Sequence, residues 1–127
     1  MTINVKFDIE NRIVTGKLIG EVDRSTLRDY TIEMEKVIIQ EKSSLVLSDY
    51  READFQLSTL DLFRMPERHS KLIAELGGNI HSLKRALIFS ENDTELAKFF
   101  ENVAVNRGQK VKIFFNDADA MAWLLNE

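Results

Sequence analysis

The chain has 127 residues, of which 44 % are apolar, and it contains 8 Phe and no Cys. Its 17 basic and 21 acidic residues give a net charge of -4 at pH 7, which argues against the concentrated basic face that nucleic-acid binding requires. The length fits one domain over residues 1–127 with a hydrophobic core, and the absence of Cys excludes disulfides, thiolate nucleophiles and Cys-ligated metals.

The first residues predict a β-hairpin. Apolar residues alternate along TINVKFDI, and a second apolar run, RIVTGKLIGEV, follows Glu10 and Asn11. Alternation with a period of two is typical of a strand with one buried face. This start does not resemble an apolar leader, and no run reaches the roughly 20 apolar residues of a membrane-spanning helix. We therefore expect a cytoplasmic protein that is at most peripheral to a membrane.

A helix is expected after the hairpin. Asp23 or Ser25 can accept hydrogen bonds from the free amides of its first turn. Apolar residues then recur at steps of three and four, at Leu27, Tyr30, Met34, Val37 and Ile38. This helix is expected to cover the sheet.

The rest of the chain alternates between strands and helices. SLVLSDY, RALIFSEN and KVKIFFND are short apolar runs typical of strands that are buried on both faces. Helical patterns cover Ser58–Leu76, Asp93–Val105 and Asp117–Leu125. Because such connections form right-handed crossovers, the sequence predicts an α/β fold with a mixed, mostly parallel five-stranded sheet, opened by a β-hairpin and carrying four or five helices.

Three segments resemble the SpoIIAA-like (STAS/Sec14-like) family. GKLIGEVDRSTL is similar to that family's second strand and first helix, LVLSDYREADFQLS to its third strand and the following loop, and DADAMAWLL to its closing helix. The resemblance covers essentially the whole chain. It implies a STAS-like fold and a small domain that binds a partner and is not an enzyme.

The resemblance implies two kinds of partner. In the anti-sigma-antagonist branch, the loop after the third strand carries a D-S-[ST]-G-like motif whose serine a partner kinase phosphorylates. Its four positions fall on Leu57, Ser58, Thr59 and Leu60, so both hydroxyls are kept, but the acidic residue and the permissive Gly are not. The Sec14-like branch implies an apolar ligand or a membrane surface, contacted by mobile helices. Apart from the family, Ser58 and Thr59 also fit simple helix capping.

The helix expected over Ser58–Leu76 is amphipathic. A helical wheel places Leu62, Met65, Leu72, Ile73 and Leu76 in one core stripe, with Asp61, Arg64, Arg68, Lys71 and Glu75 opposite. Leu57, Leu60 and Phe63 fall off the stripe and are candidates for an exposed apolar patch beside Arg64, Arg68 and Lys71. The local charge supports this, because five basic and two acidic residues lie between Arg64 and Arg85. Alternatively, the rest of the domain or the second copy in a homodimer covers these apolar side chains.

The only proline lies within this helix. Pro66 removes an amide hydrogen and is expected to kink or split the element. Together with Gly77 and Gly78 it could form the hinge of a mobile lid. The alternative is a static kink followed by a glycine cap.

Other polar residues give weaker signals. His69 falls in the apolar stripe and His81 in a loop, without metal-ligand spacing, so we interpret His69 as a satisfied core histidine and expect no metal site. Asp49, Glu52 and Asp54 gather at the end of a strand, where Mg²⁺ or a phosphoryl group could bind, although turn formation explains them equally well. The sequence contains no phosphate-binding loop or catalytic triad spacing, and we expect no catalytic residues and no cofactor.

The leading interpretation is a non-enzymatic module that reversibly binds an apolar, lipid-like ligand or a membrane surface through the 57–78 helical lid. In it, Leu57, Leu60 and Phe63 supply apolar contacts, while Arg64, Arg68 and Lys71 attract anionic groups. The alternative is an anti-sigma-antagonist-type regulatory domain that binds a protein partner and is switched by phosphorylation at Ser58 or Thr59.

Overall fold

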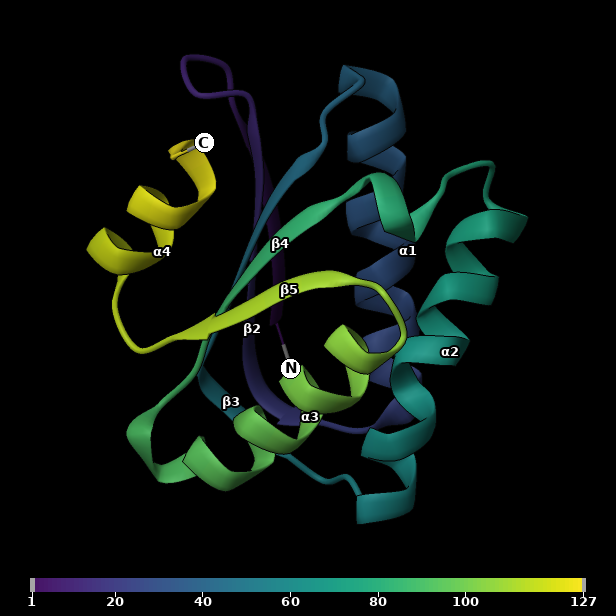
Figure 1. Cartoon of the computed structure of the whole chain (residues 1–127), viewed down its shortest axis with the longest axis vertical. Helices are drawn as coiled ribbons and strands as arrows, with labels where there is room; N and C mark the ends of the chain where they lie inside the picture. The colour runs from purple at the N-terminus through teal and green to yellow at the C-terminus, as the bar shows by residue number, and fades with distance from the viewer. Residues whose placement is uncertain (1, 127) are drawn as a thin grey trace.

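The chain forms a sheet with helices on both faces. The computed structural model describes residues 2–126, and Figure 1 shows the order of the elements. They are β1 (Thr2–Asp8), β2 (Ile13–Val22), α1 (Arg24–Glu41), β3 (Leu45–Phe55), α2 (Thr59–Glu75), η1 (Ile80–Ser82), β4 (Lys84–Ile88), η2 (Glu91–Asp93), α3 (Thr94–Asn106), β5 (Lys110–Phe114) and α4 (Asp117–Leu125). Within residues 2–126, no helix combines the length and apolar character needed to cross a bilayer.

The strands lie in the order β1-β2-β3-β4-β5. β1 pairs antiparallel with β2, and the three other pairs are parallel. Because right-handed crossovers add these strands in one direction, α1, α2 and α3 all lie on the same face of the sheet. The predicted α/β fold class, with its hairpin and mostly parallel five-stranded sheet, is confirmed, and the part of the chain that the structure describes contains four α-helices besides the short 3-10 turns η1 and η2.

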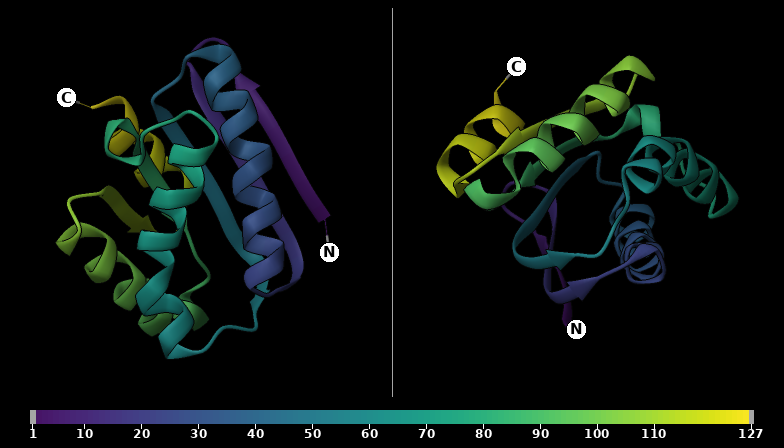
Figure 2. Two further views of the ribbon diagram at one scale, coloured as in Figure 1. Left: turned by 90° about the vertical axis from the view of Figure 1, so that its right-hand side faces the viewer. Right: turned by 90° about the horizontal axis from the view of Figure 1, so that it is seen from below.

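The sheet separates two hydrophobic cores. The larger core lies between the sheet and the helices α1, α2 and α3, and includes Val14, Leu18, Tyr30 and Phe100. The smaller core lies under α4 and includes Ile13. Ile13 and Val14 face different cores because successive strand residues point to opposite faces. Figure 2 shows α4 across the sheet from α1 and α2.

A bulge in β3 brings several side chains to the face that α1 and α2 cover. Lys17 lies opposite Asp49, but Ile19 lies opposite Glu52, so β3 contains one extra residue. As a result Tyr50 and Phe55, which lie an odd number of residues apart, both pack against the larger core. The centroids of the Tyr50 and Phe55 rings are 5.5 Å apart, and the two rings pack edge to face.

α1 begins where the sequence predicts. Asp23 is the N-cap, and its carboxylate accepts a hydrogen bond from the Thr26 amide at 2.9 Å. The predicted apolar stripe of α1 is largely confirmed, with Leu27, Tyr30, Met34 and Ile38 buried. Glu35 is a difference, because it is only 1 % exposed and lies in the same buried face.

Candidate functional site

A reciprocal pair of hydrogen bonds closes the start of α2. Ser58 Oγ accepts from the Asp61 amide at 3.1 Å, and Asp61 Oδ2 accepts from the Ser58 amide at 3.0 Å. This capping box satisfies two of the amides that have no partner within the helix, and the capping role predicted for Ser58 is confirmed. The hydrogen bond from the Ser58 amide holds the pKa of Asp61 below its usual range. Ser58 and Thr59 are both exposed to solvent.

The first turns of α2 present two large apolar side chains to solvent. Leu60 is 53 % exposed and Phe63 is 49 % exposed. The guanidinium of Arg107, just after α3, lies 5.8 Å from the centre of the Phe63 ring. Leu57 differs from the expectation, because it is half-buried and packs against the larger core. We call Ser58, Thr59, Leu60 and Phe63 the α2 start surface.

The cations of α2 are partly neutralised by neighbouring carboxylates. Arg68 lies 3.9 Å from Asp61 Oδ1, and Lys71 lies 3.2 Å from Glu67. Arg64 is exposed and forms no ion pair with any residue of the described chain. The three predicted cations therefore lie near the apolar side chains, and among them only Arg64 has no carboxylate of residues 2–126 within 4.0 Å.

The predicted hinge residues lie in regular helix and in a hydrogen-bonded helix cap. α2 runs without interruption from Thr59 to Glu75, so Pro66 does not split it, and Pro66 is fully buried. Gly77 has a φ of +97°, and the amides of Gly77 and Gly78 donate to the carbonyl oxygens of Ala74 and Ile73. This arrangement is a Schellman motif, which ends a helix firmly. The geometry agrees with the static alternative, a glycine cap.

An open groove runs between α1 and α2, which lie side by side in Figure 2. Its volume is about 690 Å³. The buried side chains of Leu27 and Met65 form part of its base, together with Leu72. Four cations also line it: Arg24, Arg28, Arg68 and Lys71. Their charge is opposed by Asp23, Asp61 and Glu75, so the groove combines an apolar base with a slight excess of positive charge.

A chain of buried polar groups lies beneath this groove. Arg85 in β4 is only 9 % exposed. Its guanidinium donates to Gln109 Oε1 at 2.7 Å, and Gln109 Nε2 donates to the carbonyl oxygen of Pro66 at 2.9 Å. No carboxylate of residues 2–126 comes within 4.0 Å of the Arg85 guanidinium. Burial lowers the pKa of Arg85, but a guanidinium stays protonated at neutral pH.

Two further buried groups have no hydrogen-bond partner in the described chain. They are His69 Nδ1 and Glu35 Oε2. Burial, aided by the charge of Arg85, lowers the pKa of His69 to about 3, so the ring is neutral. Burial raises the pKa of Glu35 to about 7, against a smaller opposing effect of Arg85. The expectation of a satisfied core histidine is therefore wrong at Nδ1, although His69 does belong to the packed side of α2.

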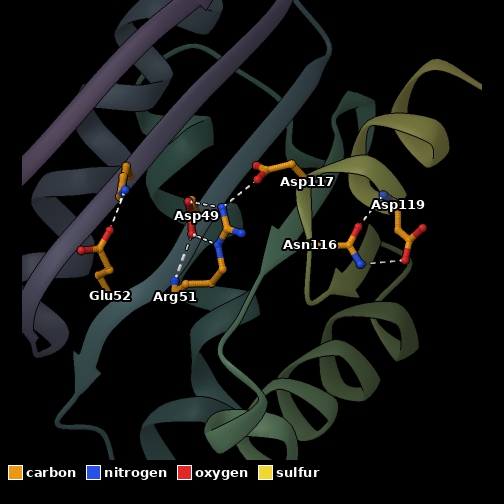
Figure 3. A network of polar contacts seen from close by, with 7 residues as sticks. Asp49, Arg51, Glu52, Asn116, Asp117 and Asp119 are labelled. Carbon is orange, nitrogen blue, oxygen red and sulfur yellow. Dashed lines mark hydrogen bonds and ion pairs between the residues drawn. The ribbon is translucent and has the colours of Figure 1, made fainter.

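Two acidic residues of β3, Asp49 and Glu52, are used in ion pairs (Figure 3). Arg51 Nε and Nη2 donate to the two oxygens of Asp49 at 3.0 and 2.8 Å, and Nη2 also reaches Asp117 of α4 at 2.9 Å. Burial opposes ionisation of Asp49, but the hydrogen bonds from Arg51 outweigh it and keep its pKa below the usual range. Glu52 pairs with Lys17 at 2.6 Å. No group of three or more His, Cys, Asp or Glu side chains within residues 2–126 could hold a metal.

The sequence interpretation missed Glu35, Arg85 and Gln109. The sequence does indicate that Arg85 is buried, because Arg85 is the first residue of the apolar run RALIF, which is typical of a strand buried on both faces. Glu35 also stands between apolar positions of the α1 stripe. The sequence gives no comparable signal for Gln109, which precedes β5 and is placed by the tertiary packing.

Comparison with known proteins identifies the fold. No protein-family model and no curated protein matches this sequence. Among solved structures, an uncharacterised protein of the DUF3478 family from Shewanella loihica PV-4, described as having a SpoIIAA-like fold, matches with a TM-score of 0.56 and 19 % identity over 97 % of this chain and 92 % of that chain. The unphosphorylated anti-sigma factor antagonist SpoIIAA matches with a TM-score of 0.56 and 12 % identity over 99 % and 100 %. The phosphorylated Bacillus cell fate determinant SpoIIAA matches with a TM-score of 0.54 and 12 % identity over 96 % and 98 %. The chain therefore has a SpoIIAA-like fold.

Proposed function

We propose that this chain is a regulatory domain that binds a protein partner through the α2 start surface, with phosphorylation of Ser58 or Thr59 as the control. One observation carries the proposal: two half-exposed apolar side chains, Leu60 and Phe63, directly follow two exposed hydroxyls at a helix N-terminus. The fold supports it, since SpoIIAA is an anti-sigma factor antagonist that is known in unphosphorylated and phosphorylated forms.

The apolar part of the surface suits a protein interface. Large side chains that keep about half of their area exposed can be covered by a partner without unfolding the domain, and aromatic residues with an adjacent arginine often dominate binding energy. Phe63 and Arg107 form such a pair. A charge at position 63 should therefore weaken binding by about 2 kcal/mol or more, which is about a 30-fold change in affinity.

A phosphate at Ser58 would change this surface in two ways. Its negative charge would be favoured by the free amides and the dipole of the helix N-terminus. It would also repel the Asp61 carboxylate that closes the capping box, and compete for Arg24 and Arg68, which lie 3.8 and 3.9 Å from Asp61 Oδ1. Phosphorylation would thus place a dianion beside Leu60 and Phe63 and rearrange their polar neighbours.

Variants of Ser58 can separate charge from capping. Asp and Asn are both good N-cap residues, so Ser58→Asp and Ser58→Asn keep the cap and differ only in charge. Tagged wild-type protein, both variants and Phe63→Asp would be purified from the native host, and partners would be quantified by mass spectrometry. Ile39→Asp is the matched control, because Ile39 is 44 % exposed on α1, away from the α2 start surface.

We expect wild type, Ser58→Asn and Ile39→Asp to capture the same partner at similar levels. Ser58→Asp and Phe63→Asp should lose it. Retention of the partner by Phe63→Asp would mean that the apolar part of the surface is not the interface. Mass analysis of the protein from the same host should also show one added phosphate, on Ser58 or Thr59.

A second candidate function uses the same exposed residues. Leu60 and Phe63 next to the unpaired cation Arg64 could contact an apolar ligand or an anionic membrane surface reversibly. The continuous helix and the firm glycine cap argue against a mobile 57–78 lid. Co-sedimentation with anionic vesicles at low salt tests this function: it predicts that wild type binds and that Phe63→Asp does not, and equal binding by both would exclude it. A homodimer that covers Leu60 would instead appear as a doubled mass in sedimentation analysis.

A further inference from the structure

Arg85 is a buried cation that lines a cavity and forms no ion pair with a carboxylate of residues 2–126. The cavity has a volume of about 30 Å³ and lies beneath α2, with Arg85 and His69 among its lining residues. Burying a charge is costly unless an opposite charge and hydrogen bonds compensate it. Gln109 accepts one hydrogen bond from Arg85, but Glu35, whose charge acts on Arg85, is not within ion-pair distance of it.

His69 adds a second unsatisfied group at the same place. Its Nδ1 is buried and has no hydrogen-bond partner in the described chain. A neutral imidazole can donate one hydrogen bond, and which nitrogen donates depends on the tautomer. A single acceptor group between Arg85 and His69 could therefore satisfy both, and a carboxylate matches the planar fork of a guanidinium.

The cavity and the α1–α2 groove share a wall. Leu27, Met65 and His69 line both of them. Met65 is unbranched and can change rotamer at low cost, so its movement would join the groove to the cavity. The cavity alone is the size of about one water molecule. A carboxylate would therefore fit there only after this wall moves. The apolar part of the same ligand is too large for the cavity and would lie in the groove.

We propose that the groove and the cavity together bind a small amphiphilic monocarboxylate, with its carboxylate on Arg85 and its apolar body in the groove. The base of the groove is apolar, at Leu27 and Met65, and Arg24 and Arg28 at its edge favour an approaching anion. Within residues 2–126, Arg85 is the only buried Lys or Arg, and a single guanidinium matches one negative charge and not a polyphosphate. This site is separate from the α2 start surface and goes beyond the proposed function.

Decanoate is a suitable probe. Binding to the intact wild-type chain would be measured by calorimetry and by the rise in melting temperature, below the concentration at which decanoate forms micelles, with 1-decanol as the uncharged comparison. Arg85→Met is the test variant, because Met removes the charge and keeps an unbranched side chain; it also leaves Gln109 Oε1 without its donor, so its fold is checked by circular dichroism. Arg64→Met is the matched control, because Arg64 is an exposed arginine of α2 that lines neither the groove nor the cavity.

We expect wild type and Arg64→Met to bind decanoate equally, and Arg85→Met to bind at least about tenfold more weakly, as loss of a charged hydrogen bond predicts. Decanol should bind the wild type and Arg85→Met alike. Ser25→Trp places a large side chain at the groove and leaves the core unchanged, and it should also weaken decanoate binding. If Arg85→Met fails to fold, Ser25→Trp is the variant that tests whether decanoate binds in the groove. Unchanged decanoate binding by Arg85→Met, unchanged binding by Ser25→Trp, or no binding by wild type would overturn the proposal.

Discussion

Replacing Glu35 with Gln should change how the stability of this protein depends on pH. Glu35 is 1 % exposed, and a Cβ added at Gly78 would lie 2.9 and 3.0 Å from its two oxygens, so the carboxyl is packed tightly between α1 and the end of α2. Burial raises its pKa from 4.5 to about 7. Gln keeps the shape of the side chain and cannot ionise.

The sign follows from proton linkage. Between pH 4.5 and about 7 the folded state holds a proton on Glu35 that the unfolded state has released, so the free energy of unfolding falls as the pH rises through this range. Each pKa unit corresponds to about 1.4 kcal/mol, so the full shift corresponds to about 3 kcal/mol. Below pH 4.5 the carboxyl is neutral in both states, and Glu35→Gln should match the wild type.

Urea unfolding followed by circular dichroism, at a series of pH values from 4 to 8, provides the assay. We expect Glu35→Gln to be more stable than wild type by up to about 3 kcal/mol at pH 8. Glu33→Gln is the control, because Glu33 is an exposed residue of the same helix, and its difference from wild type should stay small at every pH. A Glu35→Gln difference that does not change with pH, or that has the opposite sign at pH 8, would refute the reasoning.

Three further predictions concern stability. Gly78→Ala should lower the free energy of unfolding by about 1 to 3 kcal/mol, because the added methyl group would overpack against Glu35. Gly77 has open space around it but a φ of +97°, so Gly77→Ala should lower the free energy of unfolding by about 1 kcal/mol. Equal melting temperatures for wild type and Gly78→Ala would contradict the overpacking. Arg51→Met should lower the free energy of unfolding by about 1 to 3 kcal/mol at pH 7, because Asp49 loses its hydrogen bonds. Arg51 keeps the pKa of Asp49 below its usual range, so this loss should shrink as the pH falls below about 4 and Asp49 becomes protonated. A loss of the same size at low pH would contradict this. Ser58→Ala should cost about 1 kcal/mol relative to Ser58→Asn, measured by urea unfolding, because only Asn can accept the Asp61 amide hydrogen.

The sequence predicts the architecture well because its signals are local. Strands and helices follow from residue periodicity and from caps such as Asp23 and Ser58, and the bounds of α4 are the ones expected. The crossover rule then places α1, α2 and α3 on one face without knowledge of any contact. The exposure of Leu60 and Phe63 also follows from the helical wheel, since it depends only on position around α2.

The remaining features depend on contacts between distant segments. Leu57 falls off the α2 stripe, yet the loop before α2 turns it toward the larger core. The link from Arg85 through Gln109 to Pro66 joins β4, the start of β5 and α2, and no local pattern encodes it. Asp49 looks like a ligand in sequence, but its partner Arg51 also binds Asp117 at the start of α4, 66 residues away along the chain.

The proposed function is tested most directly by the affinity of the captured partner for Ser58→Asn and Ser58→Asp, measured side by side by calorimetry. The two variants share the helix cap and differ by one negative charge at the α2 start surface. We predict that Ser58→Asn binds like the wild type and that Ser58→Asp binds at least about tenfold more weakly, as an unfavourable charge beside a desolvated interface requires. Equal affinities for the two variants would contradict control at Ser58.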